Sequence, residues 1–180
     1  MAITAALVKE LRERTGAGMM DCKKALVETN ADLEAAIDLM RASGAAKAAK
    51  KAGRVASEGL VNVTISDDNK HAAILEVNSE TDFVTKGSAF IDFVEALGAL
   101  ALKNKPESVE SFVSQKLDSG ETVDEARENI IAKIGENISV RRVQIISTDT
   151  GILGAYKHGD RIAVLTVLAS QDSALAKDVA

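Results

Sequence analysis

The side chains that could carry acid–base, nucleophilic or metal chemistry are few in this sequence and lie far apart. The histidines, His71 and His158, belong to no spacing that is typical of metal ligands. Cys22 is the single cysteine, and it falls on the apolar face of a short predicted helix, where a small core residue is expected. The glycine-containing residues 15–18 precede a helix but follow another helix instead of a strand, unlike a phosphate-binding loop. The sequence therefore predicts a protein that is not an enzyme and that holds no metal or cofactor.

Residues 15–24 have the composition of a contact surface instead. A glycine-containing loop is followed there by two adjacent methionines, Met19 and Met20. Adjacent residues on a helix do not share one face, so at least one of the two side chains is expected to point outward. The flexible thioether fits irregular grooves, which makes an exposed methionine a suitable contact for a partner helix. The alternative is that both methionines fill the core between the packed N-terminal helices.

Residues 78–86 form a second candidate surface, a polar connection interrupted by Phe83 and Val84. In one interpretation Thr81 or Asp82 caps the next helix, and Phe83 packs against that helix as a hydrophobic staple. In the other, Phe83 is presented to a partner as a wedge. The second interpretation follows from its position outside the alternation of the preceding strand and outside the apolar stripe of the following helix.

A third candidate surface is residues 155–161, which read as a tight turn between two strands. His158 is expected to be exposed at this turn. A single histidine on a loop is commonly plain surface, so this residue does not by itself indicate a function.

Hydrophobic periodicity predicts the elements that must position these segments. Helical spacing at the start indicates three short helices, the third with Asp32 as its N-cap and Gly44 just past its end. Residues 45–54 hold four cations and no acid, and we expect a linker there that its alanines could make helical. The period then changes to two, which predicts a hairpin of residues 60–65 and 73–77.

The remainder of the chain contains an internal repeat. A long apolar-striped helix follows the hairpin, and helical segments fit residues 107–118 and 123–134. Residues 73–77 then match residues 163–167, ninety positions later. Two related α+β units are therefore expected, each with a small antiparallel sheet packed against helices. The helix of the second unit would begin near Asp172 and is short, so that unit is expected to be incomplete.

The charge pattern argues against a nucleic-acid binder. Residues 1–54 hold ten Lys and Arg against seven Asp and Glu, whereas the remainder holds twelve against twenty, within a net charge of -5. Proteins that bind nucleic acid usually combine a strongly basic face with aromatic side chains, and only 3% of this chain is aromatic. The sequence shows no membrane-length apolar run and no secretory leader. We therefore expect a cytoplasmic protein without a membrane or a direct nucleic-acid partner.

Five segments, in this order, resemble the family of bacterial elongation factor Ts, and the resemblance covers essentially the whole chain. The segments are KELRERTGAGMMDCKKAL at 9–26, AAKAAKKAGRVASEG at 45–59, EVNSETDFVTK at 76–86, KIGENISVRRV at 133–143 and YKHGDRIAVL at 156–165. The resemblance implies an α+β fold whose N-terminal three-helix bundle is similar to ubiquitin-associated domains. It further implies a division into four parts: the bundle at 1–44, a basic linker at 45–58, a first α+β subdomain at 59–138 and a second, truncated one at 139–180. Members of this family usually continue beyond this end, so a C-terminal part is expected to be lacking.

The activity that the resemblance implies is guanine-nucleotide exchange on elongation factor Tu, in its GDP-bound and nucleotide-free states. Five residues would lie against the GTPase domain of Tu: Met19, Met20, Lys23, Ile134 and His158. Thr81, Asp82, Phe83 and Val84 would enter Tu near its bound Mg²⁺, with Phe83 as the wedge. The alternative is an adaptor that binds helices through its ubiquitin-associated-like bundle and has no effect on nucleotides.

Overall fold

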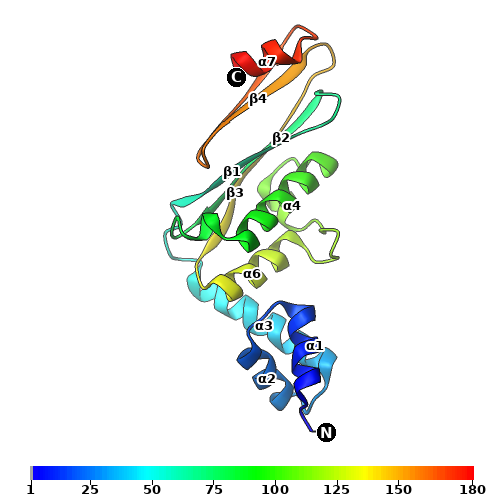
Figure 1. Ribbon diagram of the computed structural model, residues 1–180, viewed down its shortest axis with the longest axis vertical. Helices are drawn as coiled ribbons and strands as arrows, with labels where there is room; N and C mark the ends of the chain where they lie inside the picture. The colour runs from blue at the N-terminus through cyan, green and yellow to red at the C-terminus, as the bar shows by residue number, and fades with distance from the viewer. Residues whose placement is uncertain (1) are drawn as a thin grey trace.

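The computed structural model describes residues 2–180 as an elongated molecule with three helices at one end and a β-hairpin at the other (Figure 1). The N-terminal helices are α1 (Ala5–Thr15), α2 (Met19–Glu28) and α3 (Leu33–Lys51). Both ends of α1 are set by the local sequence. At its start the Thr4 hydroxyl accepts a hydrogen bond from the backbone N–H of Leu7, and at its end Gly16 adopts the left-handed conformation. The buried side chains of the bundle come from all three helices: Val8, Leu11, Cys22, Ala25, Leu26, Ala36 and Ile37.

The third helix does not end at Gly44, and the prediction that it does is wrong. Helix α3 continues to Lys51 without a break, so the predicted boundary between a bundle at 1–44 and a linker at 45–58 falls inside a helix. Gly44 is buried where α3 packs against Asn129 and Ala132 of another helix, and an added Cβ would lie at ordinary contact distance from both residues. Packing and the helix propensity of the following alanines together outweigh the stop signal of one glycine. The division of the chain into domains stays a prediction.

The centre of the molecule is a three-stranded antiparallel sheet covered by helices. Strands β1 (Glu58–Ile65), β2 (His71–Ser79) and β3 (Ile138–Ser147) lie in the order β1-β2-β3. The predicted first hairpin is confirmed, with Leu60 opposite Val77. Strand β3 pairs along the whole of β2, so residues beyond the predicted subdomain boundary at 138/139 belong to this first sheet.

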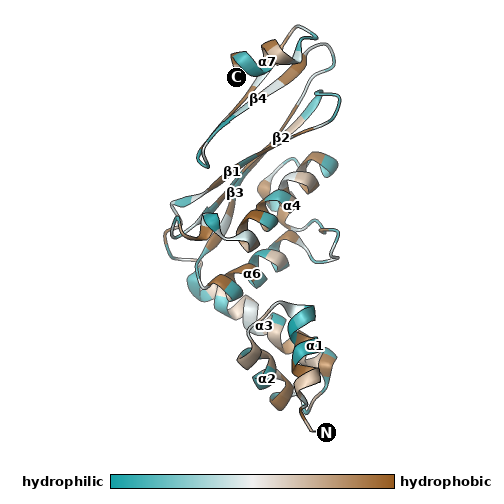
Figure 2. Ribbon diagram, in the orientation of Figure 1, coloured by the Kyte–Doolittle hydropathy of each residue, from teal (hydrophilic) through white to brown (hydrophobic). Residues whose placement is uncertain are grey.

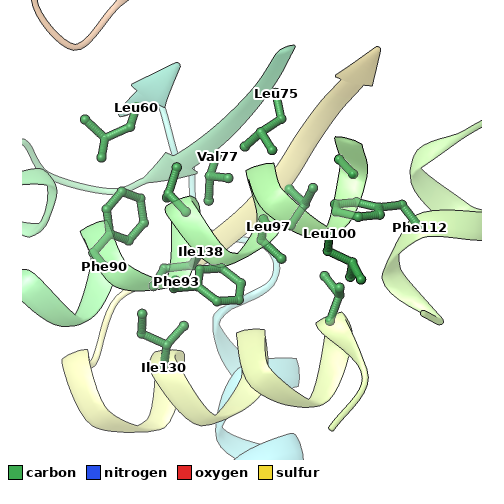
Figure 3. Packing of buried hydrophobic residues seen from close by; sticks show 14 of the residues in the cluster. Leu60, Leu75, Val77, Phe90, Phe93, Leu97, Leu100, Phe112, Ile130 and Ile138 are labelled. Carbon is green, nitrogen blue, oxygen red and sulfur yellow. The ribbon is translucent and has the colours of Figure 1, made fainter. Parts of the chain in front are cut away.

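Helix α4 (Ser88–Asn104) lies against one face of this sheet, with α5 (Val109–Val113) and α6 (Val123–Ile134) beside it. Its apolar stripe is buried between the sheet and α6, as Figure 3 shows for Phe90, Phe93 and Leu97. Figure 2 shows hydrophobic and hydrophilic residues alternating around α4, as expected of a helix with one buried face. The helix expected over 107–118 is α-helical only from Val109 to Val113.

The second hairpin is confirmed as β4 (Ile152–His158) and β5 (Ile162–Leu168), which form a separate two-stranded antiparallel sheet. Helix α7 (Ser173–Val179) follows and begins next to Asp172, as predicted, with the side chain of Asp172 as its cap. It covers β4 closely, because Gly154 leaves room for the backbone of Ala176. The fold over residues 2–180 is therefore of the α+β class, with helices alone at the N-terminal end.

Replacing Gly59 in β1 by alanine tests the close approach of β1 and β2. Gly59 has φ +146, and an added Cβ would overlap the backbone of Val77 and Asn78. Gly59→Ala is expected to lower the free energy of unfolding by about 2 to 4 kcal/mol in chemical denaturation, through backbone strain and overpacking. Gly53→Ala is the matched control, because nothing lies within 4 Å of its added Cβ, and it should change stability by less than about 1 kcal/mol. Equal effects of the two substitutions would contradict this account.

Candidate functional site

The loop between β2 and α4 presents Phe83 to solvent. The ring is 79% exposed, whereas the next residue, Val84, is 8% exposed and belongs to the main core. Val84 begins a short 3-10 helix, η1 (Val84–Lys86), in which the hydroxyl of Thr85 donates to the carbonyl oxygen of Asp82 at 2.8 Å. The chain therefore turns outward at Asp82 and Phe83 and inward again at Val84.

The interpretation of this loop as a helix cap with a staple is wrong. The N-cap of α4 is Gly87, which makes no side-chain capping bond, so neither Thr81 nor Asp82 caps that helix. Phe83 does not pack against α4, because its ring is mostly exposed. The one turn of η1 separates the polar segment from the helix, and the sequence pattern gave no sign of that turn.

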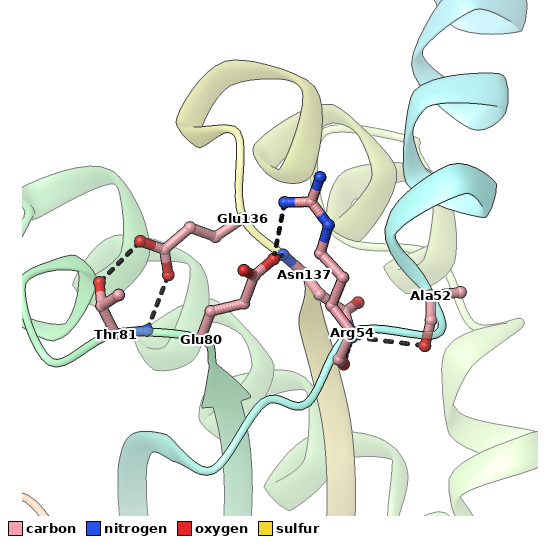
Figure 4. Close-up of polar contacts among 6 residues, drawn as sticks. All are labelled: Ala52, Arg54, Glu80, Thr81, Glu136 and Asn137. Carbon is pink, nitrogen blue, oxygen red and sulfur yellow. Dashed lines mark hydrogen bonds and ion pairs between the residues drawn. The ribbon is translucent and has the colours of Figure 1, made fainter.

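Two glutamates hold the start of this loop, and Figure 4 shows their arrangement. The carboxylate of Glu136 accepts from both the backbone N–H of Thr81, at 2.9 Å, and its hydroxyl, at 2.6 Å. In the opposite direction, the carboxylate of Glu80 accepts from the backbone N–H of Asn137 at 2.6 Å. We refer to Glu80, Thr81, Glu136 and Asn137 as the reciprocal clasp. It ties the end of β2 to the turn between α6 and β3.

The reciprocal clasp also reaches the end of α3. The buried amide of Asn137 donates to the carbonyl oxygens of Arg54, at 2.8 Å, and Ala52, at 3.5 Å. The guanidinium of Arg54 lies 3.5 Å from Glu80. The segment that leaves the N-terminal helices is thus bonded to the segment that carries Phe83 (Figure 4).

The tip of the second hairpin lies across a cleft from this loop. The cleft has a volume of about 370 Å³ and is lined by Asp82, Thr85 and Lys86 on one side and by residues 158–162 on the other. The tip is fixed to β1 by a hydrogen bond from the N–H of Val61 to the carbonyl oxygen of Asp160, 2.8 Å, and by an ion pair of Arg161 with Glu58.

His158 is exposed at the end of β4, as predicted, and its Nδ1 lies 3.0 Å from the hydroxyl of Tyr156. His158 and Asp82 line the same cleft. The structure therefore brings these two predicted site residues together, although 76 positions separate them in the chain.

The methionine pair lies at the start of α2, in the N-terminal bundle. Met19 is 61% exposed and Met20 75% exposed, so the alternative in which both fill the bundle interior is wrong. Lys23 is exposed one turn further along the helix, while Cys22 is fully buried, as predicted. Met19 also lines a groove of about 840 Å³ between this bundle and α6.

Ile134 differs from the other predicted site residues, because it is half-buried and packs on the main core at the end of α6. Gly135 then ends the helix in the left-handed conformation and directs the chain to Glu136.

The sequence analysis named Ile134 as a site residue, but it did not identify Glu80, Glu136 and Asn137. Their only signal was membership of the two motifs at 76–86 and 133–143, because nothing in either motif says that the two meet.

Within residues 2–180 we find no group of three or more His, Cys, Asp and Glu side chains placed to hold a metal ion. In that same part of the chain, none of the helices has both the length and the apolar character needed to cross a membrane.

Comparison with known proteins gives consistent matches. The family model described as Elongation factor TS matches residues 80–180. Elongation factor Ts of Ruthia magnifica subsp. Calyptogena magnifica is 67% identical over 180 residues, which is 100% of this chain and 61% of that protein. The protein of the same name from Vesicomyosocius okutanii is 60% identical over the same length, 62% of that protein. Elongation factor Ts of Arthrospira platensis is 54% identical over 99% of this chain and 72% of its own length. The chain thus spans about three fifths of the length of the first two relatives.

The contrast between Phe83 and Val84 can be tested by stability measurements alone. Val84→Ala is expected to lower the free energy of unfolding by about 2 kcal/mol, since it removes buried methyl groups. Phe83→Ala should change it by less than about 0.5 kcal/mol, because the ring is exposed. Chemical denaturation of the two variants beside the unmodified chain measures both values. A larger loss for Phe83→Ala than for Val84→Ala would show that the ring packs inside the protein.

Proposed function

Since this chain belongs to the elongation factor Ts family, we propose that it binds elongation factor Tu and accelerates the release of GDP from it. The observation that carries the proposal is Phe83, a large apolar ring held in solvent by a loop whose neighbouring residues are fixed. A single exposed apolar side chain is ordinary on a protein surface. Phe83 differs from such a side chain because the residues on both sides of it are fixed, so the ring is held in a position where a partner can contact it.

The proposed mechanism is a competition between nucleotide and exchange factor. Mg²⁺ bridges the phosphates of a bound nucleotide to protein oxygens, so a group that displaces the ion or its ligands removes attraction for the anion. We propose that Thr81, Asp82, Phe83 and Val84 act in this way on Tu, with Phe83 inserted as a wedge near its Mg²⁺. Val84 is buried within this chain, so its role in the proposal is to anchor the loop in the core.

The energies require more than one contact. A thousandfold faster release corresponds to about 4 kcal/mol off the barrier. Burial of one phenylalanine supplies about 1.5 to 3 kcal/mol. The remainder must come from other surfaces whose binding is realised as the nucleotide site opens.

We propose that these surfaces are the exposed Met19, Met20 and Lys23 on the N-terminal bundle and His158 beside the cleft. Ile134 would contribute from the end of α6. Because α3 runs unbroken from the bundle to the core and packs on α6, the methionine surface is held in a defined position relative to Phe83. A partner can therefore engage both surfaces at once without ordering a flexible linker.

In this proposal the chain breaks no covalent bond, so it is an exchange factor and not an enzyme, and it needs no cofactor of its own. It binds both GDP-bound and nucleotide-free Tu, and it leaves the equilibrium between GDP and GTP to their concentrations. The function belongs to translation in the cytoplasm and involves neither a membrane nor direct contact with nucleic acid.

A second candidate, an adaptor that binds helices without exchange, is favoured by the exposed methionine pair beside the groove at the bundle. It differs from the first at Phe83, which an adaptor of this kind would not use.

Release of a fluorescent GDP from Tu tests both candidates. The unmodified chain is expected to accelerate release, and Phe83→Ala to reduce the rate at saturating chain by about 10- to 100-fold, the kinetic equivalent of one buried aromatic ring. Binding of Phe83→Ala to Tu, measured separately by titration, should survive through the remaining surfaces.

Leu175→Ala is the matched control, because it shortens another exposed apolar side chain, far away on α7. Its rate should equal that of the unmodified chain. Binding of the unmodified chain to Tu without faster release would favour the adaptor.

A further inference from the structure

We propose that Glu136 is a positioning residue for the wedge: its carboxylate holds the loop that carries Phe83 in the orientation that nucleotide release requires. This inference rests on the proposed function and adds to it a residue that contacts no partner. It follows from three features of the reciprocal clasp.

The first feature is the geometry of the bonds. Glu136 uses both carboxylate oxygens on one residue, accepting from the N–H of Thr81 at 2.9 Å and from its hydroxyl at 2.6 Å. Hydrogen bonds to a charged acceptor are stronger than neutral ones, and two of them fix direction as well as distance. Thr81 is thereby held in both backbone and side chain, two positions before Phe83.

The second feature is the need for such a restraint. An exposed phenylalanine is favoured to fold onto nearby apolar surface, so a free loop would tend to withdraw the ring. Burial of Val84 fixes the chain immediately after the ring. Glu136 fixes it on the other side, which leaves only Asp82 and Phe83 between the two fixed points. The ring has little freedom to turn inward while both hold.

The third feature is the independence of the fold from this one carboxylate. In a variant without the Glu136 side chain, Glu80 still accepts from Asn137, and the hydroxyl of Ser79 still donates to the carbonyl oxygen of Thr81 at 2.9 Å. Val84 also remains in the core. Loss of Glu136 should therefore loosen the loop without unfolding the protein.

The kinetic test uses the fluorescent-GDP assay. Glu136→Ala, which removes both acceptors, is expected to lower the release rate at saturating chain by about tenfold with little change in the dissociation constant for Tu. Glu136→Gln should restore the rate to within about threefold, because its amide can accept from the Thr81 N–H and donate to the Thr81 hydroxyl oxygen. Glu95→Ala, which removes an exposed carboxylate from α4, should leave the rate unchanged.

A double-mutant cycle separates positioning from a general structural role. If Glu136 acts through the ring, Glu136→Ala should have less than about a twofold effect in a chain that already carries Phe83→Ala. An effect of undiminished size in that background would overturn the proposal. So would a full release rate for Glu136→Ala alone.

Amide hydrogen exchange on the isolated chain gives a readout that does not depend on Tu. Glu136→Ala should speed exchange at residues 82–86 by tenfold or more and leave the strand amides of β2 unchanged; unchanged rates at 82–86 would overturn the proposal. Should Glu136→Ala fail to fold, as judged by its thermal transition, Thr81→Val provides the same test, since it removes only the hydroxyl bond. If the unmodified chain does not accelerate GDP release at all, the proposed function fails. The rates of amide hydrogen exchange at residues 82–86 still decide, independently of that result, whether Glu136 holds the loop.

Discussion

The burial of α4 between the three-stranded sheet and α6 is the constraint on which the other features depend. Residues such as Phe90 and Leu97 are fully buried there, each worth about 1.5 to 3 kcal/mol relative to exposure. This packing places the end of β2 next to the end of α6. The reciprocal clasp exists only because these two ends meet, since its hydrogen-bonded partners lie more than fifty positions apart in the chain. The polar contacts at the candidate site are thus a consequence of the apolar core beneath them.

The same core determines how the N-terminal helices are held. Helix α6 packs against α3, and the buried Gly44 lies at this contact. At 19 residues, α3 is long enough to belong to both the bundle and the core. The basic segment that was predicted from its composition to be a linker therefore lies largely within a continuous helix that connects the bundle to the core. Its last turn leads to Ala52 and Arg54, whose carbonyl oxygens accept from Asn137. Two surfaces that are distant in sequence are connected by continuous structure.

The sequence alone allowed prediction of elements whose signal is local. The two hairpins, the apolar stripe of α4, the cap Asp32 and the start of α7 near Asp172 all depend on residues within a few positions of one another. What could not be predicted depends on tertiary contacts: the continuation of α3 through Gly44, the place of β3 beside β2, and the clasp. The same holds for the site. Exposure of a methionine could be inferred from helical geometry, whereas the nearness of His158 to Asp82 depends on how a second sheet docks on the first.

The wedge role that we propose for Phe83 requires a loop that is ordered before binding. Fixing the backbone of one residue costs about 1 to 2 kcal/mol, so ordering the three residues from Thr81 to Phe83 during binding would cost about 3 to 6 kcal/mol. That cost equals or exceeds the gain of about 1.5 to 3 kcal/mol from burying the ring. A disordered loop would therefore bind with no net benefit from its phenylalanine. Here the bonds to Glu136, the burial of Val84 and the turn of η1 order the loop when the protein folds. The folded core thus supplies the ordering free energy, and in the proposed function the gain from burying Phe83 is left for binding to the partner.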